Sequence, residues 1–299
     1  MELRHIRYFL AVAEELNFTR AAAKVGIGQP PLSQQIRALE RELGAPLFRR
    51  LPHGAELTEA GQALLPEAQV LLAQADRAMQ VARLGAAGEL GRLRLGFPSS
   101  AAFSPIVPAS VSAFRRAYPN VDLTLEETPT ATLLDRLASA ELDAAFIRLG
   151  TLDPVGLRLK LLDNEPMVIV LPARHALATS DRLPLRALAG EPFVLFPRKA
   201  GPSLFDGVIA ACRAAGFDPV LGQEAPQFSS AINLVAAELG VSVVPASIAQ
   251  LRVPGVVYLP IEERAPVARL LLATRPSDAT MATRNFSTIV VTEQRRLMA

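Results

Sequence analysis

Residues 18–43 read FTRAAAKVGIGQPPLSQQIRALEREL, and the start of this stretch predicts a short helix. Thr19 is a suitable N-cap, because its hydroxyl can accept a hydrogen bond from a free N–H group of the first turn. The helix covers Arg20–Val25, and Gly26 ends it. The segment that follows Gly26 is therefore expected to be a turn.

A second helix is expected after that turn. Pro30 and Pro31 suit its first turn, because the N–H groups that proline lacks have no partner there in any case. The helix runs to about Leu43, and Gly44 stops it. Stepping 100° per residue separates an apolar face from a polar one. The apolar face comprises Leu32, Ile36, Leu39 and Leu43, and the polar face comprises Gln34, Arg37 and Arg41, with Ser33 at its flank.

Two short helices joined by a turn are typical of a helix-turn-helix, in which one helix supports a second that enters the major groove of DNA. The side-chain types that can bond to base edges or phosphates are Gln29, Ser33, Gln34 and Arg37. The same pattern also fits a three-helix bundle with a solvated polar face, because fold does not settle function. The residues alone leave both interpretations open.

The neighbouring segments add a first helix and a hairpin. Apolar residues at helical spacing precede the pair of helices, namely Ile6, Phe9, Leu10 and Ala13. Pro52 and Gly54 mark a turn between two short extended pieces. Arg49, Arg50 and His53 lie on this hairpin, which would flank the groove as a wing.

A long helix is expected from Thr58, its cap, to about Leu84. The small apolar residues alternate at spacings of four and three, which is typical of a helix that pairs with another. They are Leu64, Ala68, Leu71, Ala75, Ala78 and Ala82. Such a helix spans about 40 Å, so we interpret it as a dimerisation helix that Pro66 bends early on. The glycines of residues 85–88 then break it and provide a hinge.

From Arg92 onward, short apolar strands alternate with segments of helical pattern, which predicts a parallel sheet with helices on both faces. The strands are Leu93–Phe97, Val121–Leu125, Ala144–Ile147, Val168–Leu171, Phe193–Phe196, Val241–Val244 and Leu270–Ala273. The helices are Pro105–Ala117, Thr130–Ala140, Ser203–Ala215, Phe228–Leu239 and Ala279–Arg295. This length suffices for two subdomains with a cleft between them.

Composition supports this division and excludes several classes of protein. The chain has 299 residues, which suggests about two globular units. A net charge of +2 excludes a polybasic protein, and 50% hydrophobic residues exclude disorder. Cys212 is the only cysteine, which excludes an intrachain disulfide and fits a reducing compartment.

The sequence also predicts a cytoplasmic protein without membrane contact. The apolar run Tyr8–Ala13 is short and is followed at once by two glutamates, so it does not resemble a signal peptide. The segment Ala231–Ala249 is interrupted by polar residues and a proline, which indicates a core segment and not a membrane span.

Three turns in the C-terminal part follow strands and precede helices, where unpaired N–H donors and hydroxyls favour anionic groups. They comprise residues 97–100, 127–130 and 200–203. Arg148, at the end of a predicted strand, could supply a forked cation for a carboxylate. Apolar walls could come from Phe103, Phe196, Leu204 and Phe228. Taken singly, the hydroxyls are also ordinary helix caps, Arg148 fits a surface ion pair, and the phenylalanines fit a core.

Nothing in the sequence indicates catalysis, a cofactor or a metal. The chain lacks a Walker loop, a His-Glu-x-x-His pair and a Gly-x-Ser-x-Gly elbow. His5, His53 and His175 are far apart in sequence, which does not favour zinc. Cys212 lies within an apolar helical pattern, as a small buried side chain does. An enzyme and an exported solute-binding protein remain the alternatives from other classes.

The order of the motifs over residues 1–61 closely resembles the DNA-binding domain of LysR-type transcriptional regulators. The resemblance rests on residues 3–9 (LRHIRYF), 18–22 (FTRAA), 29–36 (QPPLSQQI), 39–40, 43–44, 47–48 and 57–61 (LTEAG). It extends along the chain to residues 234–241 (LVAAELGV) and 244–247 (VPAS), which are similar to the effector domain of that family.

This resemblance implies an α/β fold with an all-α N-terminal module. A winged helix-turn-helix over 1–58 is followed by a linker helix and hinge over 59–88. A two-lobed, periplasmic-binding-protein-like (type 2) effector domain covers 89–299, with lobe I over about 89–162 and 267–299 and lobe II over about 163–266. The expected DNA-binding residues are Thr19, Arg20, Gln29, Pro30, Ser33, Gln34, Arg37, Arg49, Arg50 and His53.

The resemblance also implies partners. The chain is expected to bind promoter double-stranded DNA, to form a homodimer that assembles into a homotetramer, and to activate transcription, with RNA polymerase as a possible contact. Leu64, Leu71, Ala75, Ala78 and Ala82 would carry dimerisation.

The effector domain resembles the branch of regulators that controls the degradation of aromatic compounds in response to muconate, benzoate or chlorinated analogues. A small carboxylate is therefore the expected effector, and a regulator of an unrelated operon with a different effector is the alternative. The expected effector-binding residues are Ser99, Ser100, Thr128, Thr130, Arg148, Phe196, Pro202, Ser203 and Phe228.

Overall fold

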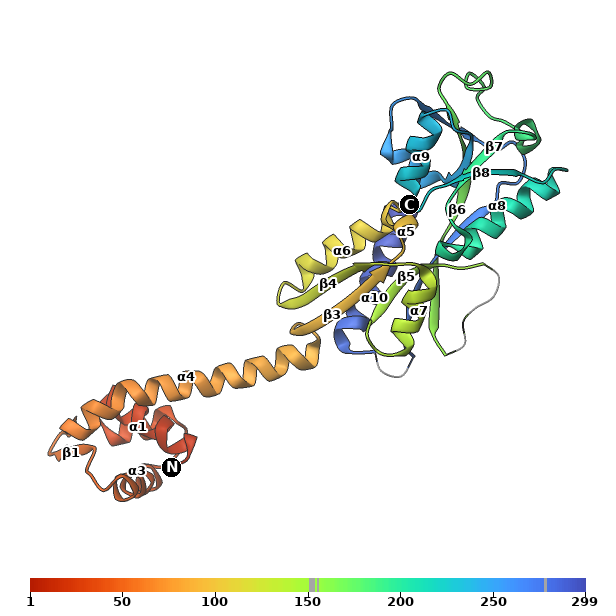
Figure 1. The fold of residues 1–299 in the computed structure, drawn as a ribbon. Helices are drawn as coiled ribbons and strands as arrows, with labels where there is room; N and C mark the ends of the chain where they lie inside the picture. Colours follow the sequence, from red (N-terminus) through yellow and green to blue (C-terminus); the bar gives the residue numbers. More distant parts are fainter. Residues whose placement is uncertain (151–153, 155, 277–278) are drawn as a thin grey trace. The chain divides into compact units, whose positions relative to one another are not determined.

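The computed structural model describes residues 1–150, 154, 156–276 and 279–299. The chain separates into two compact units, Met1–Leu84 and Gly85–Ala299, and each is described by itself (Figure 1). Parallel strands occur, as expected, but antiparallel strands accompany them. The expected fold, an α-helical N-terminal module followed by an α/β domain, is confirmed.

The N-terminal unit contains three short helices, a hairpin and the beginning of a long helix. These elements are α1 (Leu3–Glu15), α2 (Phe18–Lys24), α3 (Gln29–Leu43), β1 (Phe48–Leu51), β2 (Gly54–Leu57) and α4 (Glu59–Ala87). Its core joins the three helices to the hairpin through phenylalanine rings. The ring of Phe48 lies 5.4 Å from that of Phe9 and 5.7 Å from that of Phe18, measured between centroids.

The predicted cap of α2 is wrong. Asn17 caps this helix, because its Oδ1 accepts hydrogen bonds from the backbone N–H groups of Thr19 (2.9 Å) and Arg20 (3.0 Å). The helix therefore begins at Phe18, two residues earlier than predicted. In α3 the predicted apolar face is buried up to Leu39, whereas Leu43 is 44% exposed.

Two polar side chains fasten the hairpin to the helices. The Glu40 Oε1 on α3 accepts hydrogen bonds from the backbone N–H groups of Leu47 (2.8 Å) and Phe48 (3.2 Å). The Thr58 Oγ1 accepts one from the N–H of Gly61 (3.0 Å), as expected of the cap of α4.

The helix α4 continues through Gly85 to Ala87, so the predicted end at Leu84 is wrong.

The C-terminal unit contains a seven-stranded sheet in the order β10-β6-β11-β5-β3-β4, with β9 beside β6, and a separate pair, β7-β8. The strands are β3 (Gly91–Phe97), β4 (Val121–Glu127), β5 (Ala144–Arg148), β6 (Arg158–Pro172), β7 (Pro192–Leu195), β8 (Val220–Glu224), β9 (Ser242–Pro245), β10 (Val256–Pro260) and β11 (Val267–Thr274). The sheet is mixed: β3 pairs in parallel with β4 and β5, whereas β6 and β11 pair antiparallel with their neighbours. The expectation of a wholly parallel sheet is therefore wrong.

Helices cover these strands. They are α5 (Ser99–Ala102), α6 (Ile106–Ala117), α7 (Thr130–Ala138), α8 (Pro202–Ala214), α9 (Phe228–Ala236) and α10 (Met281–Met298), with short 3-10 helices η1 (Leu185–Leu188), η2 (Arg198–Ala200) and η3 (Ala246–Leu251). In Figure 1, α6, α7 and α10 surround β3, β4 and β5, and α8 and α9 gather with β7 and β8.

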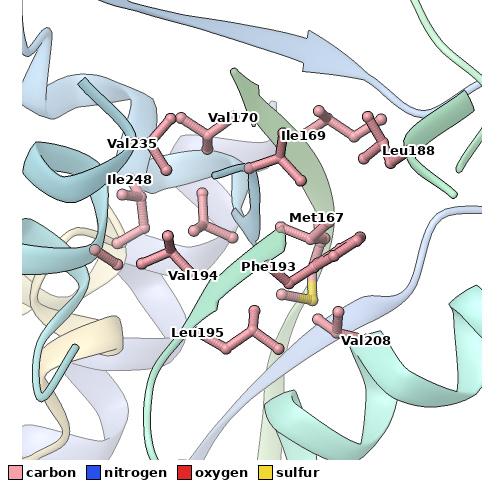
Figure 2. Close-up of a cluster of buried hydrophobic side chains, with 14 of the residues drawn as sticks. Met167, Ile169, Val170, Leu188, Phe193, Val194, Leu195, Val208, Val235 and Ile248 are labelled. Carbon is pink, nitrogen blue, oxygen red and sulfur yellow. The ribbon is translucent and has the colours of Figure 1, made fainter. Parts of the chain in front are cut away.

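The long strand β6 passes from one hydrophobic core to the other. Up to Pro166 it pairs with β11, and from Met167 onward it pairs with β9. The first core, which we call the lobe I core, contains Phe114, Phe146 and Phe286. The second, the lobe II core, brings together Met167, Ile169, Phe193, Val235 and Ile248 (Figure 2).

Two glycines of α4 give a prediction about packing. A Cβ at Gly61 would clash with the carbonyl oxygen of Leu47 and stand 2.9 Å from Leu57 Cδ2, whereas a Cβ at Gly85 would have no neighbour within 4 Å. Gly61→Ala should therefore destabilise the protein by about 2 kcal/mol, the usual cost of overpacking. Gly85→Ala should stabilise it by up to about 1 kcal/mol, because alanine favours helix. Denaturant unfolding of both variants checks this, and equal effects would contradict the packing described.

Candidate functional site

The outer face of α3 presents polar side chains. Gln34, Arg37 and Arg41 are exposed, and together with the turn after the helix they line an open surface groove. Pro30 is exposed at the first turn and Gln29 is half-buried. This exposed surface has the side-chain types that the sequence predicted for it.

Ser33 does not share this exposure. It is 4% exposed, and its Oγ accepts a hydrogen bond from Gln29 Nε2 at 2.9 Å. Ser33 therefore restrains Gln29, because the hydrogen bond limits the conformations that the Gln29 side chain can adopt.

The cations near α2 and the hairpin have partners within the unit. Arg20 donates to the backbone oxygen of Glu15 at 2.6 Å, and Arg49 pairs with Glu56 at 2.6 Å. The Arg50 guanidinium lies 4.7 Å from the centroid of the Phe18 ring, a distance suited to a cation–π contact. His53 and Thr19 are exposed.

The seam predicted along α4 varies in exposure. Leu64 and Ala75 are half-buried, Leu71 is 39% exposed, and Ala78 and Ala82 are exposed. At its start, the seam lines an apolar groove together with residues of α1 and the N-terminus. An exposed apolar stripe of this kind indicates a contact surface.

In the C-terminal unit, turns from both lobes surround a cavity of about 200 Å³. The lining residues are Pro98, Ser99, Ser100, Glu127, Thr128, Pro129, Phe196, Ala200, Gly201, Leu204, Pro226, Gln227 and Phe228. The rings of Phe196 and Phe228 contact each other, with their centroids 4.8 Å apart. We call this cavity the inter-lobe pocket.

The structure divides the predicted effector-binding residues into two groups. Ser99, Ser100, Thr128, Phe196 and Phe228 line the inter-lobe pocket. The other group comprises Thr130, Arg148, Pro202 and Ser203, which the lining does not include in the described part of the chain.

Three residues of the second group bond to one another beside the pocket. The Arg148 backbone N–H donates to Thr130 Oγ1 at 3.4 Å, and the Ser203 Oγ donates to the Arg148 carbonyl at 3.1 Å. These bonds connect α7 and α8 through the end of β5.

Arg148 forms a buried ion pair. It is 3% exposed, and its Nη2 donates to Glu165 Oε2 at 2.6 Å and to the carbonyl of Ser100 at 3.0 Å. Its Nη1 donates to the carbonyl of Ala268 at 2.7 Å. The other oxygen of Glu165 accepts a hydrogen bond from the N–H of Ser247 at 2.5 Å. The pair therefore links the pocket segment at Ser100 with lobe II.

The sequence suggested Arg148 as a cation free to meet a ligand, but both of its Nη atoms donate to partners within the chain. Its buried Nε has no hydrogen-bond partner among the described residues. The partner, Glu165, lies on β6, 17 residues later in the chain than Arg148, and carries no local signal of this contact. Likewise, Glu127 and Gln227 line the pocket but were not singled out, although Glu127 belongs to one of the predicted turns.

Three helices begin at the pocket. Pro129 precedes α7, Gly201 precedes α8 and Gln227 precedes α9, and all three line the cavity. None of these helices has a side-chain cap, so the N–H groups of their first turns are left for water or a ligand. An anionic group is favoured at such a position.

Burial raises the pKa of the Cys212 thiol to about 11, so it carries its proton at neutral pH. Within residues 1–150, 154, 156–276 and 279–299, no three His, Cys, Asp or Glu side chains converge on a metal position. No helix of the described ranges is long and apolar enough to cross a membrane.

Comparison with known protein families assigns both units. Residues 3–62 match the bacterial regulatory helix-turn-helix protein family, lysR type, and residues 86–295 match the LysR substrate binding domain. The chain belongs to the LysR family of transcriptional regulators. As a member of this family it is a DNA-binding regulator with an effector-binding domain, and not an enzyme.

Similar proteins extend over almost the whole chain. The transcriptional regulator BudR of Raoultella terrigena is 41% identical over 96% of this chain and 99% of its own length. The regulator CatR of Pseudomonas putida is 36% identical, over 97% and 98%. The crystal structure of the LysR family regulator CbnR superposes with a TM-score of 0.87 at 28% identity, covering 97% of this chain and all of that one.

The buried ion pair gives a prediction about stability. Arg148→Ala leaves the Glu165 carboxylate buried without its partner, which should destabilise the C-terminal unit by about 3–5 kcal/mol. The double variant Arg148→Met, Glu165→Met removes both charges and should recover most of that loss. Thermal unfolding measures both, with Arg115→Ala, an exposed arginine on α6, as control. A double variant as unstable as the single one would contradict the cause given.

Proposed function

We propose that this regulator binds promoter DNA through α2, α3 and the hairpin, and that it senses a small carboxylate in the inter-lobe pocket. The observation that carries the second part is the convergence of the N-terminal ends of α7, α8 and α9 on one cavity. Their N–H donors suit a carboxylate without the help of a lysine or arginine side chain.

The DNA-binding part rests on the exposed face of α3. Gln34 and Arg37 point into solvent, and Gln29, restrained by Ser33, lies at the start of the helix. Glutamine and arginine are suited to forked bonds with adenine and guanine, and an arginine can equally bind phosphate. The similar regulator CbnR has been solved in complex with its target DNA, with a TM-score of 0.85 to this chain.

The effector part rests on the chemistry of the pocket walls. Ser99, Ser100 and Thr128 offer hydroxyl groups, and Phe196 and Phe228 offer apolar faces. A carboxylate joined to a flat apolar body fits both, and a cavity of about 200 Å³ limits the effector to a small metabolite. An intermediate of aromatic degradation has this chemistry, and CatR is among the similar regulators.

A second candidate is a LysR-type regulator of an unrelated metabolic operon. It is favoured by one observation: BudR, at 41% identity, is more similar to this chain than CatR is, at 36%. Both candidates place the effector in the same pocket and differ only in its apolar body.

The mechanism requires the effector to bind one arrangement of the lobes more tightly than another, because a ligand without such a preference shifts no equilibrium. The pocket is lined by segments of both lobes, so ligand binding acts on their separation. Pairing of α4 helices through Leu64, Leu71, Ala75, Ala78 and Ala82 would join two chains, and two such dimers would form the tetramer. The change in the lobes would then alter how the paired α3 helices engage the promoter.

The DNA-binding face can be tested by substitution. Gln34→Ala and Arg37→Ala should each weaken binding to the chain's own upstream promoter, by roughly five- to 100-fold, because each removes contacts to bases or phosphates. Ser33→Ala should have a smaller effect, since it acts only through Gln29. Gel-shift titration measures all three, and Lys199→Ala, an exposed cation of the C-terminal unit, is the control. Unchanged affinity for both α3 variants would contradict the proposed face.

Salt dependence gives an independent test of the same proposal. Promoter affinity should fall steeply as salt is raised, because each neutralised phosphate releases counterions. The slope of log affinity against log salt should decrease by about one unit in Arg37→Ala if this arginine contacts a phosphate. A flat profile for the unmodified chain would argue against phosphate contacts altogether.

A further inference from the structure

Glu127 is the only charged side chain among the residues that line the inter-lobe pocket in the described part of the chain. It is the last residue of β4 and is exposed to solvent. A carboxylate in this position is unexpected in a pocket whose helix ends favour an anion. Its negative charge therefore affects which carboxylates can bind in the pocket.

The Glu127 carboxylate takes no part in the hydrogen bonds and ion pairs of the described residues. The neighbouring Glu126 bonds to Arg136, whereas Glu127 has no bonded partner among the described residues. The helix α7 begins at Thr130, three residues later, and no side-chain hydrogen bond caps it. Neither an ion pair nor a helix cap accounts for Glu127, which is exposed and lines the pocket.

Nearby arginines do not neutralise this charge. Arg148 is bonded to Glu165, and Arg198 pairs with Asp206 through two bonds of 2.7 and 2.8 Å. Lys199, the other cation of η2, is exposed and does not line the cavity. The lobe I wall therefore carries the unpaired charge of Glu127 beside the partial positive charge of the α7 N-terminus at Pro129.

Lobe II contributes the contrasting wall. Gly201 and Gln227 stand at the N-terminal ends of α8 and α9, whose first-turn N–H groups carry partial positive charge. A ligand carboxylate is attracted to this wall, and the far end of the ligand then meets Glu127. A second carboxylate at that end is repelled, whereas an ammonium or another hydrogen-bond donor is attracted.

We infer that Glu127 selects an effector that carries a cationic or hydrogen-bond-donating group at the end remote from its carboxylate, and that it discriminates against dicarboxylates. This inference rests on the proposed function, since it names the chemical class of ligand for the same pocket. It narrows the class from small carboxylates in general to amino or hydroxy carboxylates.

Three probes of similar shape test the inference on the full chain: benzoate, terephthalate and 4-(aminomethyl)benzoate. They share a ring and a carboxylate, and carry at the para position a hydrogen, a second carboxylate and a protonated aminomethyl group, respectively. Calorimetric titration at pH 7.5 should rank the ammonium compound first and terephthalate last. In Glu127→Gln the affinity for the ammonium compound should fall, and that for terephthalate should rise, each by roughly three- to tenfold, as expected of a solvent-accessible charge pair.

Controls separate the local charge from other effects. Asp122→Asn makes the same change in net charge on the same strand, but Asp122 lies outside the pocket lining, so it should leave the ranking unchanged. Phe228→Ala removes a pocket wall and should weaken all three probes together.

The outcomes distinguish the two proposals. If the probes bind and Phe228→Ala weakens them, but Glu127→Gln leaves their ranking unaltered, the role of Glu127 is refuted and the carboxylate pocket stands. If Asp122→Asn changes the ranking as much as Glu127→Gln, overall charge is responsible and the inference again fails. If no probe binds the unmodified chain, the carboxylate pocket itself is overturned, and the role of Glu127 with it.

Discussion

The ion pair between Arg148 and Glu165, with its backbone partners, joins five segments of the C-terminal unit. Arg148 ends β5, Glu165 lies where β6 passes between the two cores, and their further partners belong to α5, β11 and η3. Each charge is buried, so each requires the other and the backbone groups around them. The position of Ser100, and with it one wall of the inter-lobe pocket, is thereby tied to the junction of the lobes.

In the N-terminal unit, hydrogen bonds between side-chain oxygens and backbone N–H groups have a comparable role. Asn17 determines where α2 begins, and Glu40 holds the first residues of the hairpin through two backbone N–H groups. The hairpin in turn completes the core by placing Phe48 between Phe9 and Phe18. A stable arrangement of helices beneath the polar face of α3 is what a DNA-reading surface requires, because its side chains must keep their spacing.

The two units present different binding surfaces, as expected of a member of the LysR family. The N-terminal unit exposes forked donors on a helix, whereas the C-terminal unit encloses a small cavity with polar helix ends and aromatic faces. In the proposed carboxylate pocket, recognition of the anion would fall to backbone N–H groups, because Arg148 is bonded to Glu165. Glu127, the charged residue of the lining within the described part of the chain, would then distinguish one carboxylate from another.

Much of the local structure could be predicted from the sequence. The three N-terminal helices, the cap at Thr58 and strands such as Leu93–Phe97 follow from periodicity and from residues with strong backbone preferences. The strands β8 and β10 were not predicted. Every residue of β8 is exposed, so the strand has no apolar pattern, and its pairing with β7 depends on a distant segment.

By itself the sequence determined the family, most of the elements in their order and three of the turns that line the pocket, because these depend on residues close together in the chain. Only the tertiary structure decided that Ser33 is buried and bonded to Gln29, that Arg148 is paired with Glu165, and that Glu127 lines the cavity. Each of these depends on burial or on a partner supplied by packing. The free energy of a charged or polar side chain depends on such surroundings, and neighbours along the chain do not specify them.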